Sequence, residues 1–297
     1  MLRKVFLILI VASIFVSSSL QARVIHKERS LYRNIMVTQE SGQRCLMFTI
    51  RRSAKSRQSC VDLRNPKRLV FRYAQVSMTS FALQAKPEKI LIIGLGGGTL
   101  PMTYADLLPE ADITSVEIDP AVTKVAEEFF DFKRSERNRV AEIDARVFVK
   151  RALRKQQKYD LIVLDAFNGD YIPEHLMTAE FLQEVKDLMD NDGVLVANTF
   201  SSSKLYSHES ATYQSVFGEF YNFKIPLGNR VIIASMNKLP GYKTLIEQAQ
   251  KLELPLQDLD VSLMDNISLI KPNPDWNPKA RILTDQFAPA NLLQGKK

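Results

Sequence analysis

The sequence predicts a protein of the α/β class: a doubly wound, mostly parallel sheet that ends in an antiparallel hairpin and follows a small β-rich domain. Three observations lead to this class. Apolar strand-like runs alternate with helical segments from residue 89 onward. A glycine-rich turn follows the first of these strands, as in βαβ units whose backbone approaches a ligand. Two late strands, residues 221–225 and 230–235, are too close in sequence for a crossover helix and should pair antiparallel.

The chain has 297 residues, 45% hydrophobic and 25% charged, which is enough to bury a full core. Residues 1–22 combine the basic Arg3 and Lys4 with a short apolar run and small residues before Ala22, as in a secretory signal. An uncleaved membrane anchor is the alternative. In either case we expect the body of the protein to be exported (periplasmic or extracytoplasmic) or anchored by this segment.

The formal net charge of +7 is spread over many small clusters. No basic motif interleaved with aromatic residues accompanies it, so we expect a solvated basic surface and no nucleic-acid partner.

Residues 23–85 are expected to form the β-rich N-terminal domain. Alternating polar and apolar residues predict strands at 31–39 and 44–51, with a turn at Ser41-Gly42. Cys45 and Cys60 flank a basic turn, so a hairpin would place them on facing strands. There they would form either a disulfide or two small buried hydrophobic side chains. Apolar residues at helical intervals predict a helix within residues 69–83.

The main domain is expected to span residues 86–240 and to bind a nucleoside. Before the hairpin, its predicted strands are residues 90–93, 113–118, 139–143, 161–164 and 194–197. Its predicted helices are residues 100–108, 120–130, 147–155 and 178–189, the first of them with Thr99 as its N-cap. Residues 241–297 are expected to form one amphipathic helix, to about residue 254, and a proline-rich tail.

Residues able to bind a ligand stand at the ends of four successive strands: Gly94, Glu117, Asp144 and Asp165. The carboxyl ends of parallel strands meet at one edge of the sheet, which is where open α/β sheets bind ligands. Glu117 could accept hydrogen bonds from two ribose hydroxyls, and Asp144 could accept one from an adenine amino group. The glycines between residues 94 and 98 would let the backbone approach the same ligand. The pattern therefore predicts an adenosine-containing ligand.

These segments resemble those of the polyamine aminopropyltransferase (spermidine synthase) family. The matching stretches are IIGLGGGTL, VEIDP, Asp144-Ala145 and YDLIVLDAF, and the similarity extends from about residue 32 to residue 237. Phe71 and Tyr73 resemble the aromatic pair of a further family segment. The resemblance implies the fold of S-adenosylmethionine-dependent transferases.

The family resemblance also implies an activity, namely transfer of an aminopropyl group from decarboxylated S-adenosylmethionine to an amine. Asp165 matches the residue that takes a proton from the acceptor, and Tyr73 matches a tyrosine of the substrate pocket, so both are expected to be catalytic. The residues expected to bind the donor are Gly94, Gly96, Gly98, Glu117, Asp144 and Ala145. Those expected to bind the acceptor are Gln58, Asn168 and Asp170.

The expected partners are therefore small molecules, a nucleoside donor and an amine acceptor. Decarboxylated S-adenosylmethionine or S-adenosylmethionine would bind as a co-substrate, with no permanent cofactor and no metal. A homodimer is expected, and contact with a membrane only through residues 1–22 if they are uncleaved.

Five positions lack acids that the family carries: Leu69, Val70, Gln75, Gly96 and Asn168. A desolvated ammonium group needs an anionic partner, so these losses argue against ordinary putrescine chemistry, and Asp170 would restore only one charge. Two alternatives stay open. One is a methyltransferase on the same fold, in which Gly96 would tolerate a donor that carries a carboxylate. The other is an exported binding protein that has kept the fold and lost the chemistry.

Overall fold

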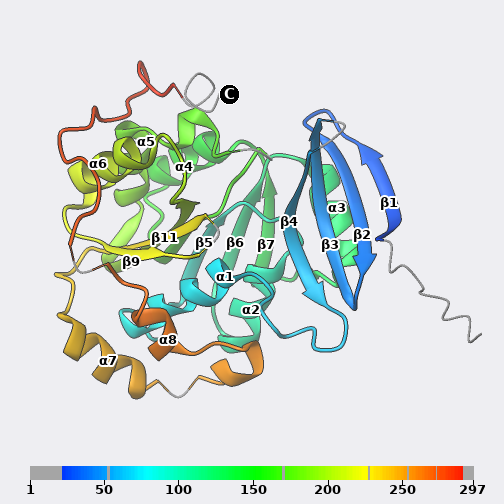
Figure 1. The fold of residues 1–297 in the computed structure, drawn as a ribbon, viewed down its shortest axis with the longest axis horizontal. Helices are drawn as coiled ribbons and strands as arrows, with labels where there is room; N and C mark the ends of the chain where they lie inside the picture. The colour runs from blue at the N-terminus through cyan, green and yellow to red at the C-terminus, as the bar shows by residue number, and fades with distance from the viewer. Residues whose placement is uncertain are drawn as a thin grey trace, which may run out of the picture.

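The computed structural model describes residues 22–51, 54–168, 171–226, 228–252, 254–271 and 273–289, without the side chains of 49–51 and 54–56. A seven-stranded sheet with helices on both faces stands beside a four-stranded antiparallel sheet (Figure 1). The predicted fold class is confirmed. The domain boundaries expected after residues 85 and 240 stay predictions.

The small sheet is a meander of four strands in the order β1-β2-β3-β4. Its strands are β1 (Arg23–Arg29), β2 (Asn34–Glu40), β3 (Gln43–Arg51) and β4 (Ala54–Asp62). The predicted turn between β2 and β3 is present, with positive φ angles at Ser41 and Gly42. Cys45 and Cys60 lie opposite each other on β3 and β4 and form a disulfide, which decides between the two alternatives left open by the sequence.

The large sheet has the strand order β10-β11-β9-β8-β5-β6-β7. Its strands are β5 (Lys89–Ile93), β6 (Asp112–Glu117), β7 (Asn138–Glu142), β8 (Tyr159–Leu164), β9 (Met189–Phe200), β10 (Tyr221–Lys224) and β11 (Asn229–Ser235). The strands from β9 to β7 are parallel, and the predicted β10–β11 hairpin is antiparallel at the edge. The chain builds outward from β5 in one direction and from β8 in the other. The strand order therefore reverses between β5 and β8, where such sheets open a crevice for ligands.

Helices cover both faces of the large sheet. One face is covered by α1 (Arg72–Ser77), η1 (Met78–Ala82), α2 (Thr99–Leu107), α7 (Tyr242–Gln250), η3 (Leu256–Leu259) and α8 (Leu263–Ile267). The opposite face carries α4 (Ala145–Arg154), η2 (Glu174–Leu176), α5 (Ala179–Lys186) and α6 (Tyr206–Phe217). Buried strands such as β5 supply apolar side chains to both layers, which explains their continuous apolar sequence.

The remaining helix, α3 (Pro120–Phe129), joins the two sheets. Its Val122 and Val125 pack with Ile35, Leu46 and Phe48 of the small sheet in one apolar cluster. This contact holds the small sheet so that Ser59 of β4 lies beside the glycine-rich turn that follows β5. The small sheet thereby forms one wall of the site described below.

Two predictions about the helices need correction, and one helix was missed. Thr99 is not the N-cap of α2: Gly98 is, in a left-handed conformation, and the Thr99 hydroxyl is 3.0 Å from the Ser59 hydroxyl. Helix α5 ends at Lys186, and residues 189–193 belong to β9 rather than to the helix end. Helix α6 was not predicted, because its buried face carries polar residues instead of an apolar stripe.

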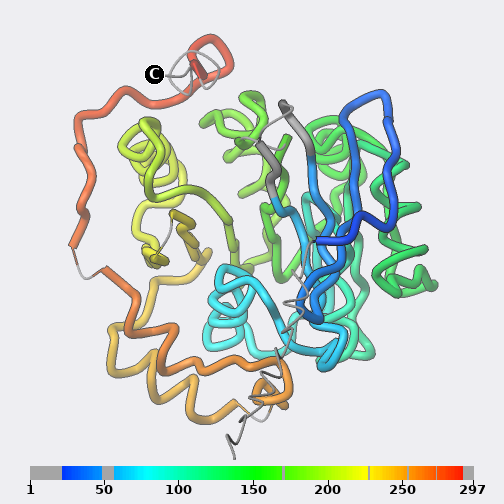
Figure 2. Tube along the Cα trace, turned by 45° about the vertical axis from the view of Figure 1, so that its right-hand side comes forward, coloured from blue at the N-terminus to red at the C-terminus, as the bar shows by residue number. Residues whose placement is uncertain are grey.

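The C-terminal segment continues past α8 along the outside of the large domain. Figure 2 shows it running beside α6 toward the end where α4 and α5 lie. Asp285 forms an ion pair with Arg146 of α4, and Ala179 donates a hydrogen bond to the Leu283 carbonyl group. These contacts fix the tail against the helical layer that borders the site.

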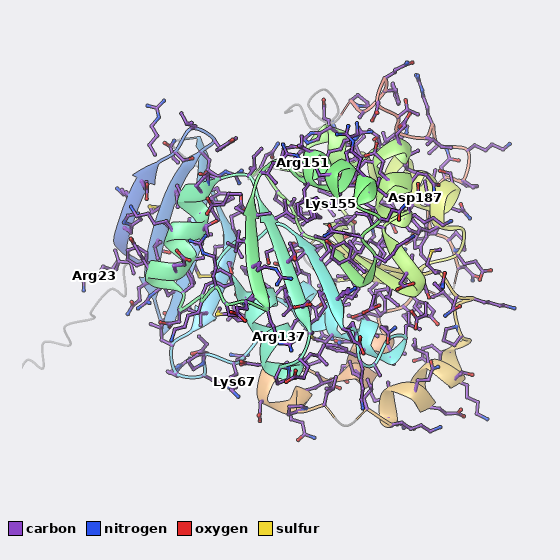
Figure 3. All side chains as sticks on the ribbon, turned by 180° about the vertical axis from the view of Figure 1, so that it is seen from behind. Arg23, Lys67, Arg137, Arg151, Lys155 and Asp187 are labelled. Carbon is purple, nitrogen blue, oxygen red and sulfur yellow. A yellow bond between two sulfur atoms is a disulfide. The ribbon has the colours of Figure 1, made fainter. Side chains whose placement is uncertain are left out.

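Charged side chains are spread over the outer surface. Figure 3 shows the molecule from behind, with Arg151 and Lys155 labelled at the C-terminal end of α4, where both are exposed. Within the described ranges, no helix combines the length and apolarity needed to cross a bilayer.

Candidate active site

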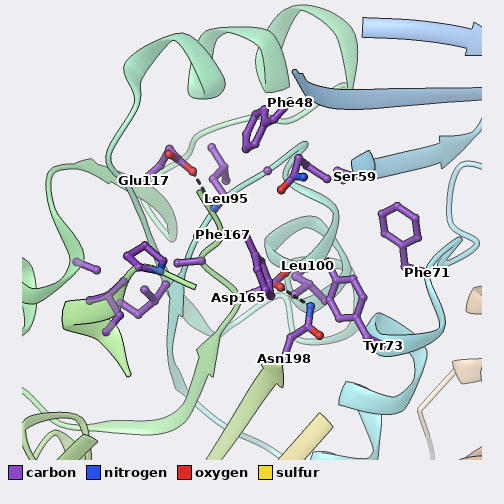
Figure 4. Close-up of a pocket in the computed structure, with 18 of the residues that line it drawn as sticks. Phe48, Ser59, Phe71, Tyr73, Leu95, Leu100, Glu117, Asp165, Phe167 and Asn198 are labelled. Atoms are coloured by element: carbon purple, nitrogen blue, oxygen red, sulfur yellow. Dashed lines mark hydrogen bonds between the residues drawn. The ribbon is translucent and has the colours of Figure 1, made fainter. Parts of the chain in front are cut away.

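A cavity of about 560 Å³ opens at the carboxyl ends of the parallel strands. Residues from the ends of β5, β6, β7, β8 and β9 form its floor, and residues of β4 and α1 face them from the opposite side. It lies at the point where the strand order reverses. Figure 4 shows Asp165 near the middle of this cavity, with Glu117 on one side and Tyr73 and Phe71 on the other.

The glycine-rich turn follows β5 and brings backbone close to the floor of the cavity. Gly94 has φ +105°, and a Cβ atom built on it would lie 2.3 Å from the Asp165 carbonyl oxygen. Gly98 has φ +76°, and its Cβ would lie 2.6 Å from the Phe132 ring. A side chain at either position would clash and would adopt a strained backbone. Gly96 is less crowded, because its Cβ would lie 3.5 Å from the Ser59 Cβ.

Glu117 ends β6 and is buried, with 8% of its surface exposed. Its two carboxylate oxygens accept hydrogen bonds from the backbone N–H groups of Leu95, at 3.3 Å, and Asp119, at 3.0 Å. Burial raises the pKa of Glu117, while Arg33 and these N–H groups act in the opposite direction. The carboxylate is therefore held at a fixed position beside the glycine turn, where its remaining lone pairs can accept from a diol.

Asp144 follows β7 and is the N-cap of α4, with Oδ1 accepting from the Val147 N–H at 3.0 Å. Its Oδ2 lies 3.0 Å from Nε2 of His175, which also lines the cavity. Ala145, the first residue of α4, lines the same end. Asp144 therefore combines a capping role with a place in the cavity wall, and His175 is its partner there.

Asp165 follows β8 and is the carboxylate at the centre of the cavity. Its Oδ2 accepts a hydrogen bond from the Tyr73 hydroxyl at 2.9 Å, and its Oδ1 accepts one from the Asn198 amide at 2.9 Å. The Asn229 side-chain amide in turn donates to the Asn198 Oδ1 at 3.2 Å. Burial raises the pKa of Asp165 to about 6, although the hydrogen bonds from Asn198 and Tyr73 act to lower it.

A carboxylate with such a pKa can accept a proton near neutral pH. Its two hydrogen bonds fix its direction toward the cavity. Tyr73 stays protonated and a donor, because burial and the adjacent Asp165 charge raise the pKa of its hydroxyl.

The structure brings most of the predicted site residues to this cavity. Those that line it are Gln58, Tyr73, Gly94, Gly96, Glu117, Asp144, Ala145 and Asp165. Gly98 lies behind the turn, as the cap of α2. Asn168 is exposed and exchanges two hydrogen bonds with the Tyr171 backbone, at 2.9 and 3.1 Å. Asp170 lies outside the described residues.

Sequence reasoning missed Asn198 and Asn229, the two amides that extend the hydrogen-bond network from Asp165. Asn198 interrupts an otherwise apolar stretch, VLVANTF, near the end of β9. Such a polar residue inside a buried strand is a signal that could have identified it. Arg33 was also missed: it lines the cavity, stacks over the Phe48 ring at 4.5 Å and lies 3.6 Å from Asp119. Among the described residues, no three His, Cys, Asp or Glu side chains form a group suited to a metal ion.

Comparison with known proteins gives matches over most of the chain. Residues 71–233 match the spermine/spermidine synthase domain family. A polyamine aminopropyltransferase of Vibrio vulnificus is 51% identical over 278 residues, which cover 92% of this chain and 92% of that protein.

Two solved structures share the fold. The spermidine synthase of Thermotoga maritima has a TM-score of 0.66 at 18% identity, covering 84% of this chain and 85% of its own. Human methyltransferase-like protein 13, solved in complex with SAH, has a TM-score of 0.53 at 24% identity, covering 69% of this chain and 93% of its own.

The Vibrio relative corrects the expected location. The protein was expected to be exported or anchored through residues 1–22. The chain is instead similar over 92% of its length to a polyamine aminopropyltransferase, an enzyme of polyamine biosynthesis. The expected location is therefore wrong. The segment assigned as a signal or anchor is residues 1–22, of which residues 1–21 lie outside the described residues.

Proposed function

Because the chain belongs to the spermine/spermidine synthase family, we propose that it transfers an aminopropyl group from decarboxylated S-adenosylmethionine to an amine, with Asp165 as the base. The observation that carries the assignment of the base is the position of Asp165. It lies where the strand order reverses, between Tyr73 and Asn198, and burial raises its pKa to about 6.

The donor is proposed to lie over the ends of β5, β6 and β7. Glu117 would accept hydrogen bonds from the ribose hydroxyls, since both of its oxygens are already oriented by backbone N–H groups. Asp144 and Ala145 would border the adenine. Gly94 and Gly96 let the backbone approach the donor, and Gly98 lets helix α2 begin directly behind it. The donor is a co-substrate that leaves as methylthioadenosine.

The proposed reaction has two steps at one nitrogen. The Asp165 carboxylate takes a proton from the acceptor ammonium group, which exposes the nitrogen lone pair. That lone pair attacks the aminopropyl methylene carbon bonded to the sulfonium sulfur. A C–N bond forms as the C–S bond breaks, and the C–S electron pair stays on sulfur, which becomes the neutral thioether of methylthioadenosine. Tyr73 and Asn198 hold the carboxylate in position throughout.

The acceptor is proposed to enter from the side of Gln58, which lines the cavity. Asn168 and Asp170 belong to the loop after β8, and their contact with the acceptor stays a prediction. A homodimer also stays a prediction, which light scattering of the purified protein tests.

The test is turnover by purified protein supplied with decarboxylated S-adenosylmethionine and a panel of amines. Chromatography should detect methylthioadenosine only when an amine is present. The same assay with intact S-adenosylmethionine separates the methyltransferase alternative, which would yield S-adenosylhomocysteine instead. Absence of methylthioadenosine with every amine, from protein that binds the donor, would contradict the proposal.

A further inference from the structure

The C-terminal residues 283–287 pack against the part of the chain that borders one end of the cavity. Leu283 is fully buried and lies in an apolar cluster with Tyr171 and Met177, which belong to the segment between β8 and α5. The Leu283 carbonyl group accepts a hydrogen bond from the Ala179 N–H, at 2.8 Å. This short segment, more than a hundred residues away in sequence, is therefore built into the wall behind the cavity.

One carboxylate of this segment joins two helices. Thr284 and Phe287 exchange two backbone hydrogen bonds, of 2.9 and 2.8 Å, which close a turn around Asp285. The Asp285 carboxylate accepts from both Nη groups of Arg146, at 2.6 and 2.8 Å, and its Oδ1 also accepts from the Thr178 hydroxyl, at 2.7 Å. Paired hydrogen bonds of this kind fix direction as well as distance. Asp285 thus ties the first turn of α4 to Thr178, the N-cap of α5.

Both points of attachment stand next to residues that line the cavity. Arg146 comes two residues after Asp144, and Thr178 follows η2, which contains His175. Asp144 and His175 line the cavity and lie 3.0 Å apart, from Oδ2 to Nε2. Asp285 therefore joins the two elements whose side chains meet at the end of the cavity over β7, on the donor side of Asp165.

A second ion pair joins the same helices farther from the cavity. Glu184 of α5 binds the other edge of the Arg146 guanidinium, with its oxygens 3.1 Å from Nε and 3.2 Å from Nη2. Glu184 lies on the body of α5, whereas Thr178 stands at its N-terminal end. Loss of the Asp285 carboxylate would therefore leave α4 and α5 joined and would release the ends that face the cavity.

We infer that Asp285 is a positioning residue for the nucleoside donor: it holds the N-terminal ends of α4 and α5 in the arrangement that brings Asp144 and His175 together. The inference rests on the proposed aminopropyl transfer, which places the adenine of the donor beside Asp144. Asp285 itself lies outside the lining of the cavity and acts through Arg146 and Thr178. Because coupling between two sites is reciprocal, a bound donor should in turn hold residues 283–287 in place.

Calorimetric binding of methylthioadenosine, which carries the same adenosine as the donor, tests the inference apart from catalysis. Asp285→Asn should raise its Kd about tenfold or more, the effect of one misplaced hydrogen bond to the ligand. In steady-state assays the loss should appear in KM for the donor and not in kcat. Asp275→Asn is the matched control, because Asp275 anchors the same C-terminal part through Lys224, at 2.6 Å, on the strand at the opposite edge of the sheet from β7.

The control variant should change Kd by less than about twofold, and thermal unfolding checks that both variants are folded. An unchanged Kd in Asp285→Asn would overturn the inference. An equal rise in both variants would also overturn it, since the effect would then be a general loosening of the C-terminal part.

Hydrogen exchange of the wild type gives a second test that needs no variant. Saturating methylthioadenosine should slow amide exchange in residues 283–287 by about threefold or more and leave residues 273–279 nearly unchanged. Equal protection of both segments, or protection of neither, would overturn the inference while leaving aminopropyl transfer intact. A wild type that binds no methylthioadenosine would contradict the proposed function, and the inference would fail with it.

Discussion

Replacing the proposed base by an amide is expected to remove activity and to change how stability depends on pH. Burial raises the pKa of Asp165 from 3.8 to about 6. At about 1.4 kcal/mol per pKa unit, this rise means that folding disfavours the ionised carboxylate by about 3 kcal/mol, which is an upper limit because the side chain borders an open cavity. Asp165→Asn carries no charge and so avoids that cost at neutral pH, while its amide nitrogen loses one of the two accepted hydrogen bonds, a loss that does not depend on pH.

The sign of the pH dependence follows from the direction of the shift. Because the pKa in the folded protein lies above that in the unfolded chain, the folded state binds the additional proton, and Asp165 lowers stability as pH rises through the window from about 4 to 6. The unfolding free energy of Asp165→Asn minus that of the wild type should therefore grow with pH, by up to about 2.4 kcal/mol between pH 4 and pH 7.

Urea unfolding of both proteins at several pH values measures this difference. The exposed Asp106 on α2 offers a matched control, because Asp106→Asn removes a carboxylate that is not buried. A flat difference for Asp165→Asn would refute the reasoning, since it would mean that the carboxylate is not desolvated in the fold.

Three further substitutions probe the site and its support. Tyr73→Phe removes a hydrogen bond that lowers the pKa of the proposed base, so the acid limb of the kcat/KM profile should move to higher pH, by about one unit or less. Gly94→Ala should cost about 3 kcal/mol or more in urea unfolding, whereas Gly241→Ala, in open space at negative φ, should change stability by less than about 0.5 kcal/mol. Arg230→Met leaves the buried Glu209 carboxylate without its cationic partner, which lies 3.0 Å away in the wild type. The free energy of unfolding should fall by about 3–5 kcal/mol, measured as a lower urea midpoint.

The parts of the fold that could be predicted are the buried parallel strands, because a short apolar run followed by a turn indicates such a strand without reference to distant residues. The apolar runs at β5 and β8 are buried on both faces, and β6 is buried over most of its length. At the end of each strand stands a site residue, and these residues meet at the same sheet edge. Their order along the chain, together with the short gap before β11, was enough to predict the sheet and the place of the cavity.

The parts that could not be predicted depend on side-chain partners far away in sequence. Helix α6 buries the polar side chains of Glu209, Ser210 and Thr212, so its sequence lacks the apolar stripe by which a buried helix is recognised. Arg230 of β11 binds Glu209 and Ser210, and this partner is known only from the tertiary structure. The partnership of Asp144 with His175 likewise depends on the path of the loop after β8. Hydrogen-bond partners of this kind follow from tertiary structure, so no local period in the sequence reveals them.

The assignment of Asp165 as the base is tested most directly by a single turnover of enzyme-bound decarboxylated S-adenosylmethionine mixed with a reactive amine. Donor affinity should be nearly equal in wild type and Asp165→Asn, because Glu117 and the glycine turn hold the donor in the other part of the cavity. The rate of methylthioadenosine formation should fall by about 10² to 10⁴ in the variant, as expected for loss of a general base. A variant that binds the donor normally and reacts within tenfold of the wild-type rate would contradict the assignment.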